Sequence, residues 1–329
     1  MKKIINQPED VVEEMVEGIA SAYPDTVKQI PGTSVIVRKD APVSGKVGII
    51  SGGGSGHEPA HAGYVGKGML DAAVSGSVFT SPTPDQVFEA IKATDSGEGV
   101  FLVVKNYTGD VINFEMAAEL AEAEGITVDY IVVNDDVAVE DSSFTTGRRG
   151  IAGTVLVHKI VGALAEKGAP LETIKRAAEK AVANVRSIGM ALTSCIVPEA
   201  GKASFNLEDD EMEIGIGIHG EPGIERETLT SANDIAERLT DKVLADMDFS
   251  DSDVVVMVNG LGATPEMELY IVNKKVQEIL NTKGITVYRT YVGEYMTSLE
   301  MAGCSVTLMK VDEELKTLLD ADTLAPAFH

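Results

Sequence analysis

The clearest indication of the fold is the run Val47-Gly48-Ile49-Ile50-Ser51-Gly52-Gly53-Gly54-Ser55-Gly56, which passes from a β-branched segment into a series of glycines. A short apolar run predicts a buried strand, and the glycines after it predict a turn. The pattern recurs downstream, where Val100 to Val104 ends in Lys105-Asn106-Tyr107-Thr108-Gly109-Asp110 and the helical stretch Asn113 to Ala123 follows. Strands alternating with helices predict an α/β fold with a largely parallel sheet, whose ligands bind in loops beyond the carboxyl ends of the strands.

The rest of the chain continues this alternation and predicts two α/β domains. Residues 151–185 are rich in Ala, Leu, Lys and Glu, and they predict two helices separated by Gly168-Ala169-Pro170. We expect the first domain to span residues 1–185 as a three-layer sandwich with a largely parallel sheet. We expect the second, a smaller α/β sandwich, to span residues 186–329.

The composition excludes several classes of protein. The 329 residues are 44% hydrophobic, and 27 Lys and Arg against 52 Asp and Glu give a net charge of −25. Such a charge repels nucleic-acid phosphates and anionic lipid headgroups, so we expect no nucleic-acid and no membrane partner. Two cysteines are too few for a disulfide framework, the first residues do not resemble a signal peptide, and no apolar run reaches the roughly 18 residues of a membrane span. We therefore expect a cytoplasmic protein.

The glycine run continues as Ser55-Gly56-His57-Glu58-Pro59-Ala60-His61. Successive glycines let backbone N–H groups approach a ligand, so the run predicts a cradle for an oxygen or a phosphate, with a ligand-free turn into a helix as the alternative. The segment also satisfies the zinc-protease pattern H-E-x-x-H, which requires both histidines on one helix face. Because Pro59 suits the first position of a helix, we expect His57 to lie in the preceding loop and His61 to be a packed or capping helical histidine. Neither a metalloprotease nor any metal site is predicted.

Three further segments carry groups capable of chemistry. Asp110 could take a proton from a substrate hydroxyl, or it could be a helix N-cap or turn aspartate. His219 ends a predicted strand at residues 212–218 and could be an accessible nucleophile or an ordinary histidine. The pair Arg148-Arg149 could receive an anion, although we expect ordinary ion pairs there.

Five motifs together resemble the dihydroxyacetone kinase K-domain family, and within it the substrate-binding K subunits of phosphoenolpyruvate-dependent enzymes linked to the phosphotransferase system. The motifs are Gly52-Gly53-Gly54-Ser55-Gly56-His57-Glu58-Pro59, Gly76-Ser77-Val78-Phe79-Thr80-Ser81-Pro82, Lys105-Asn106-Tyr107-Thr108-Gly109-Asp110, Gly147-Arg148-Arg149-Gly150 and Gly217-Ile218-His219-Gly220-Glu221-Pro222-Gly223. The resemblance extends over essentially the whole chain in family order.

The resemblance implies that His219 adds to the ketone carbon of dihydroxyacetone and forms a covalent hemiaminal, which would discriminate against polyols such as glycerol. It also implies a set of residues that line the substrate: Gly54, Ser55, Gly56, His57, Ser81, Lys105 and Asp110. Either Asp110 or His57 would be the base. We favour Asp110 as the base and His57 as its hydrogen-bonding partner, although the sequence does not exclude the reverse.

The resemblance further implies a homodimer without a cofactor of its own. ATP-using members carry a fused nucleotide-binding domain, and this sequence has no Walker-type loop. A separate L subunit with bound ADP and magnesium is therefore expected as the phosphoryl donor, recharged by a phosphocarrier M subunit. The alternative is a dihydroxyacetone-binding paralogue that acts as a sensor or coactivator of a transcriptional regulator. The presence of Asp110, His57 and Lys105 favours the kinase subunit, because a sensor needs only capture.

Overall fold

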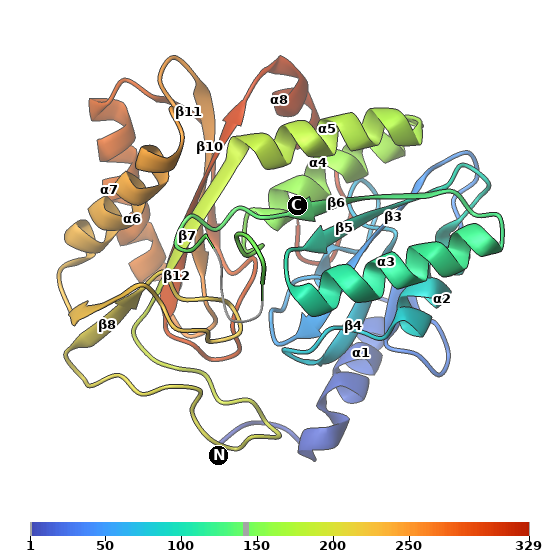
Figure 1. Ribbon diagram of the computed structural model, residues 1–329, viewed down its shortest axis with the longest axis horizontal. Helices are drawn as coiled ribbons and strands as arrows, with labels where there is room; N and C mark the ends of the chain where they lie inside the picture. The colour runs from blue at the N-terminus through green and yellow to red at the C-terminus, as the bar shows by residue number, and fades with distance from the viewer. Residues whose placement is uncertain (1, 141–144, 329) are drawn as a thin grey trace. The chain divides into compact units, whose positions relative to one another are not determined.

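The computed structural model describes residues 2–140 and 145–328, which form two compact units, each built on a six-stranded sheet (Figure 1). The N-terminal unit contains residues 2–133, 154–182 and 317–328, and the C-terminal unit contains residues 134–140, 145–153 and 183–316. The division at residue 183 lies close to the predicted boundary at 185. The predicted ranges 1–185 and 186–329 nevertheless assign some segments differently, because residues 134–140 and 145–153 belong to the C-terminal unit and residues 317–328 return to the N-terminal unit.

The sheet of the N-terminal unit has the strand order β1-β2-β4-β3-β5-β6. Its strands are β1 (Val27–Gln29), β2 (Val35–Arg38), β3 (Gly48–Ser55), β4 (Ala72–Val78), β5 (Val100–Lys105) and β6 (Val128–Val133). The strands from β4 to β6 are parallel, while β1 and β2 run antiparallel at one edge. The prediction of a largely parallel sheet is confirmed.

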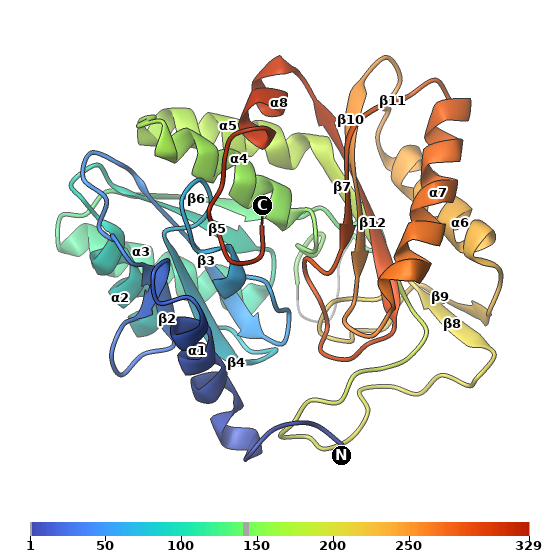
Figure 2. The ribbon, with the colours of Figure 1, turned by 180° about the vertical axis from the view of Figure 1, so that it is seen from behind.

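Helices cover both faces of this sheet. They are α1 (Val11–Ala22), α2 (Pro84–Thr94), α3 (Thr108–Ala123), α4 (Thr154–Glu166) and α5 (Leu171–Asn184). On one face α2 and α3 pack against β2 to β6, and on the other α1 and α4 contact the sheet; α3 is in front in Figure 1 and α1 in Figure 2. In β5, alternate residues such as Leu102 join the core under α2 and α3, and Phe101 is equally buried. A parallel strand buried on both faces needs such a continuous apolar run.

The glycine run belongs to a strand, which corrects the sequence prediction of a loop leading into a helix. Strand β3 extends to Ser55, and Gly52 and Gly54 pair with Val74 and Gly76 of β4. A Cβ at Gly52 would lie 2.4 Å from the carbonyl oxygen of Val74, so close approach of the neighbouring strand requires glycine here. After β3 comes only the short 3-10 turn η2 (Ala62–Tyr64), so no helix N-terminus stands behind the glycines.

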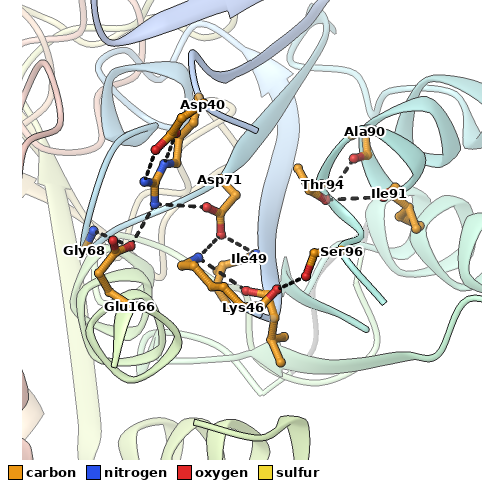
Figure 3. Close-up of polar contacts among 12 residues, drawn as sticks. Asp40, Lys46, Ile49, Gly68, Asp71, Ala90, Ile91, Thr94, Ser96 and Glu166 are labelled. Carbon is orange, nitrogen blue, oxygen red and sulfur yellow. Dashed lines mark hydrogen bonds and ion pairs between the residues drawn. The ribbon is translucent and has the colours of Figure 1, made fainter. Parts of the chain in front are cut away.

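A buried charged cluster lies at the opposite, amino-terminal end of β3 and β4 (Figure 3). Asp71, directly before β4, accepts a hydrogen bond from the backbone N–H of Ile49 at 2.8 Å and forms ion pairs with Lys46 and Arg38. Arg38 also donates to Glu166 of α4 at 2.7 Å. Each buried charge therefore has a partner, and the cluster joins β2, β3, β4 and α4 away from the carboxyl ends of the strands.

The end of the chain packs into the N-terminal unit beside the segment that follows β3. The backbone N–H of Leu324 donates to the carbonyl of Lys67, and that of Ala327 donates to Gly63, both at 2.9 Å. The ring of Phe328 packs edge-on against the buried Tyr64, with centroids 6.1 Å apart. Residues 324–328 are thus an integral part of this unit.

The C-terminal unit is a mixed sheet covered on one face by two helices. Its strand order is β11-β10-β12-β7-β8-β9, and in this sheet only β10 and β11 are parallel. The strands are β7 (Val185–Ala191), β8 (Glu211–Ile214), β9 (Glu225–Thr228), β10 (Asp253–Gly260), β11 (Thr286–Gly293) and β12 (Gly303–Val311). Helices α6 (Ala232–Asp246) and α7 (Glu266–Thr282) bury a common apolar core against the sheet, and the short α8 (Glu313–Leu319) follows β12. The predicted smaller α/β sandwich is confirmed.

The predicted strand at residues 212–218 ends early. Strand β8 stops at Ile214, where Gly215 takes a φ of +78° that favours glycine and turns the chain out of the sheet. His219 therefore lies in the turn after the strand. Among the described residues, no helix is long and apolar enough to cross a membrane.

Candidate functional site

The carboxyl ends of three neighbouring strands bring together most of the predicted substrate residues. Ser81 follows β4, the glycines close β3, Lys105 is the last residue of β5, and Asp110 lies in the first turn of α3. In the sheet order β4-β3-β5 these ends are adjacent. The structure therefore places these side chains together, where the fold class predicts a ligand.

Asp110 is held between a hydroxyl and an ammonium group. The hydroxyl of Ser81 donates to Oδ1 of Asp110, and Nζ of Lys105 lies 3.6 Å from Oδ2. The N-cap of α3 is Tyr107, and Asp110 makes none of the capping hydrogen bonds of this helix. The interpretation of Asp110 as a helix cap is therefore wrong, and its carboxylate is aimed at the ends of β4 and β5.

Lys105 is completely buried and donates to the carbonyl of Gly52 at 3.2 Å. Burial lowers the pKa of Lys105, and the neighbouring Asp110 carboxylate partly offsets this effect. A Cβ at Gly53 would lie 2.2 Å from Nζ of Lys105, so the missing side chain leaves the space that the ammonium group occupies. The glycine run therefore leaves room for the buried ammonium group of Lys105.

The remaining residues predicted from the glycine segment have different surroundings. The buried hydroxyl of Ser55 donates to the carbonyl of Gly76 at 2.7 Å, and the N–H of Gly56 donates to the Glu58 carboxylate at 3.0 Å. A Cβ at Gly54 would come within 2.5 Å of the Thr80 backbone nitrogen, so Gly54 admits the loop that leads to Ser81.

His57 is buried and stacks on Phe79, with centroids 5.2 Å apart and the planes inclined by 18°. Phe79 has a φ of +58°, a strained conformation for a residue other than glycine. Such a conformation persists only where the surrounding structure imposes it. No helix contains His57 and His61, so the H-E-x-x-H pattern lacks the geometry that zinc binding requires. The described residues contain no group of three His, Cys, Asp or Glu placed to hold a metal ion.

Two histidines that the sequence analysis did not assign to the site continue the cluster into the core. Nζ of Lys105 lies 3.0 Å from Nε2 of His61, and Nδ1 of His61 lies 3.0 Å from Nε2 of His158 on α4. Because the ammonium can only donate, we assign the proton of His61 to Nδ1, which then donates to His158. Burial and the charge of Lys105 lower the pKa of both rings, that of His158 to about 3.

The expectation of a packed or capping helical histidine is confirmed in part: His61 is buried and is the N-cap residue of the turn η2, but it lies in no α-helix and its side chain makes no capping hydrogen bond. The only signal in the sequence for His158 is its position within the apolar run Val155-Leu156-Val157-His158, where a polar residue needs a partner.

The C-terminal unit carries a separate group of predicted site residues. One carboxylate, Glu221, holds His219 at two points: Oε2 accepts the backbone N–H of His219 at 2.9 Å, and Oε1 lies 3.2 Å from Nδ1. Burial opposes ionisation of Glu221, but His219 and Arg149 together lower its pKa to about 2. A carboxylate at Nδ1 keeps the proton on that nitrogen and leaves the lone pair on Nε2, as the acid of a catalytic triad does.

The arginine pair forms the ion pairs that were expected. Arg148 donates to Asp246 at 2.8 Å, and the fully buried Arg149 donates to Asp136 at 2.8 Å. Burial raises the pKa of Asp136 to about 6 despite its arginine partner.

One α/β unit has an aspartate beside a buried lysine at its strand ends, and the other has a histidine held by a carboxylate. Such polar groups on an α/β scaffold are typical of the class of α/β proteins that bind small molecules. The chain belongs to the Dak1 domain family, whose model matches residues 17–327. The resemblance predicted from the motifs is confirmed.

Relatives and solved structures agree with this family. The chain is 59% identical to the "PTS-dependent dihydroxyacetone kinase 1, dihydroxyacetone-binding subunit DhaK" of Listeria innocua, over 95% of each chain. Among solved structures, the "Dihydroxyacetone kinase operon co-activator Dha-DhaQ" is 40% identical with a TM-score of 0.91, covering 96% of this chain and 98% of that one. The dihydroxyacetone kinase of C. freundii in complex with AMP-PNP and Mg2+ is 36% identical with a TM-score of 0.93, and the match covers 99% of this chain but 60% of that one.

Proposed function

We propose that this protein is the dihydroxyacetone-binding subunit of a phosphoenolpyruvate-dependent dihydroxyacetone kinase. The name and full-length similarity of the Listeria relative support the substrate and the type of kinase. The observation that carries the catalytic part is the Asp110 carboxylate, which is positioned by Ser81 and Lys105 at the carboxyl ends of the strands. A protein that only binds dihydroxyacetone has no need of a positioned base.

In the proposed first step His219 captures the substrate. Nε2 forms a bond to the ketone carbon, the π electrons of the carbonyl move to its oxygen, and that oxygen takes up a proton while the ring loses the one at Nδ1. The adduct is a neutral hemiaminal, and Glu221 stabilises the positive charge that develops on the ring in between. Glycerol has no carbonyl carbon to accept the nitrogen, so it is excluded chemically.

In the proposed second step a hydroxyl of the captured substrate attacks a phosphoryl group. The new P–O bond forms as the bond to the departing nucleotide breaks, and the hydroxyl proton passes to Asp110. Lys105 donates to the carbonyl of Gly52 and lies 3.6 Å from Oδ2 of Asp110, so its proposed role is to orient the Asp110 carboxylate. His57, stacked on Phe79, is assigned the supporting contact to the substrate.

The donor nucleotide is assigned to partner subunits. In the C. freundii kinase, solved with AMP-PNP and Mg2+, the part similar to this chain is 60% of the whole. We propose an L subunit that carries ADP and magnesium, a phosphocarrier M subunit that recharges it, and a homodimer of this chain. The predicted cytoplasmic location is part of the same proposal.

The test is formation of dihydroxyacetone phosphate from phosphoenolpyruvate, with candidate L and M subunits, in the presence and absence of this chain. Strict dependence on the chain supports a kinase subunit, and the matched variant His219→Ala should abolish both the mass adduct with dihydroxyacetone and the activity. The similarity to the operon co-activator keeps the sensor as a second candidate. Capture at His219 without any turnover would favour that candidate and reject the kinase assignment.

A further inference from the structure

The loop that carries His219 is built around a buried arginine from a distant part of the chain. Arg149 has no exposed surface, and its Nε and Nη2 atoms donate to Asp136 and to the carbonyl of Gly215 at 2.8 Å each. Gly215 is where the chain leaves β8 with positive φ, four residues before His219. Arg149 thus fixes the point from which the histidine loop departs.

The same guanidinium lies close to the carboxylate that holds the histidine. A Cβ at Gly217 would lie 2.0 Å from Oε2 of Glu221 and 2.6 Å from Nη1 of Arg149. Both charged groups therefore occupy the space beside this glycine, and the turn closes over them with the N–H of Gly217 donating to the backbone carbonyl of Glu221 at 3.2 Å. A side chain at position 217 would collide with both groups.

We propose that Arg149, anchored on Asp136, is a positioning residue for the nucleophile: it holds Glu221 as a carboxylate against Nδ1 of His219 and so keeps the lone pair on Nε2. The inference rests on the proposed function, because it assigns these residues to the capture step. It also explains why so large a cation is buried completely in this unit, where an ordinary surface ion pair would serve stability as well.

The charges around Glu221 support a chain of contacts in which Arg149 positions Glu221 and Glu221 positions His219. Arg149 and His219 favour its ionised form against the cost of burial, while Asp136 faces Arg149 and Asp135 is close enough to raise the pKa of Asp136. With Arg149 removed, Glu221 would remain buried beside one partner and the Gly215 turn would lose its anchor. Residues that orient the ligands of a metal site change its affinity or activity by about 10- to 100-fold when removed, and we expect a comparable effect on the histidine that Arg149 and Glu221 orient.

The experiment measures tautomer and capture separately in the full chain. Nitrogen-15 NMR of the histidine rings reports which nitrogen of His219 carries the proton in the free protein, and carbon-13-labelled dihydroxyacetone reports the adduct. In Arg149→Met and Glu221→Gln we expect mixed tautomers and about 10- to 100-fold slower capture. Arg149→Lys keeps a cation but loses the paired hydrogen bonds to Asp136 and Gly215. It should therefore recover part of the wild-type tautomer and part of the capture rate.

Two matched controls remove an ion pair elsewhere in the same unit. Arg148→Met loses the pair with Asp246, and Glu213→Gln loses the pair with Arg226 and weakens the bond to the N–H of Gly223. Both should keep the wild-type tautomer and capture rate. If Arg149→Met does not fold, Glu221→Gln and Arg149→Lys decide the question.

Retention of the Nδ1–H tautomer and of the capture rate in the folded Arg149 and Glu221 variants would overturn the proposal. Absence of any adduct in the unaltered protein would instead reject the proposed function, while the tautomer measurement would still test the role of Arg149.

Discussion

Gly53→Ala offers a direct test of how the site is built. The added Cβ would lie 2.2 Å from Nζ of Lys105 and 3.2 Å from Oδ2 of Asp110, at a φ of +150° that L side chains rarely adopt. To reach an ordinary contact distance the ammonium must retreat by about 1 Å. Lys105 is fully buried, so this movement lengthens its hydrogen bonds to Gly52 and His61, now 3.2 and 3.0 Å, without water to replace them.

The magnitude follows from these losses. A hydrogen bond to a charged group contributes roughly 1.5 to 3 kcal/mol, and the disfavoured backbone conformation adds about 1 to 3 kcal/mol. We expect the free energy of unfolding to fall by roughly 3 to 5 kcal/mol, measured by urea denaturation followed by circular dichroism. Turnover should fall as well, because Asp110 loses the cation that orients it.

Gly18→Ala is the matched control for Gly53→Ala. Gly18 lies in α1 with no heavy atom within 4 Å of the added Cβ, so alanine should raise stability by about 0.5 to 1 kcal/mol. A loss below about 1 kcal/mol in Gly53→Ala, with turnover unchanged, would refute the account of a lysine packed into the space of a glycine.

Three further variants examine other parts of the structure. Asp110→Asn should leave the dihydroxyacetone adduct intact by mass spectrometry, yet lower turnover by about 10² to 10⁴ because the base is lost; equal turnover would remove Asp110 from the chemistry. Asp71→Asn leaves Lys46 and Arg38 underpaired and should destabilise the protein by about 3 to 5 kcal/mol in urea, with normal capture by the folded protein; a loss under 1 kcal/mol would contradict the role of the buried cluster. His158 has a folded pKa of about 3 against 6.5 unfolded, so the unfolded state takes up its proton first and stability is lost as pH falls from about 6.5 to 3. His158→Gln keeps an acceptor for His61 but removes the titrating ring. The difference in the free energy of unfolding between pH 7 and pH 4, measured by urea denaturation, should therefore shrink by several kcal/mol, and an unchanged difference would contradict this account.

The sequence predicted the parts of the site that depend on strand ends. Lys105 and Asp110 were expected in one loop region because they follow a strong apolar strand, and the structure brings them to 3.6 Å. The glycine run was misassigned because glycine has a low strand propensity, whereas close packing against β4 decides its conformation here.

Partners far apart in the sequence could not be predicted. His61 and His158 are separated by 97 residues, and Arg149 contacts Gly215 across 66 residues. Local periodicity contains no information about such pairs, because only tertiary packing brings them together. The same is true of the segments that belong to a different unit from the residues on either side of them in the sequence.

The docking of residues 324–328 beside η2 has a consequence for synthesis. A ribosome delivers a chain from its N-terminus, and domains commonly fold as they emerge. Here the segment after β3, including Tyr64, receives its covering residues Leu324, Ala327 and Phe328 only after the intervening residues of the C-terminal unit have been synthesised. We therefore expect the nascent N-terminal unit to leave Tyr64 uncovered, and to complete its packing only after the C-terminal unit has been translated.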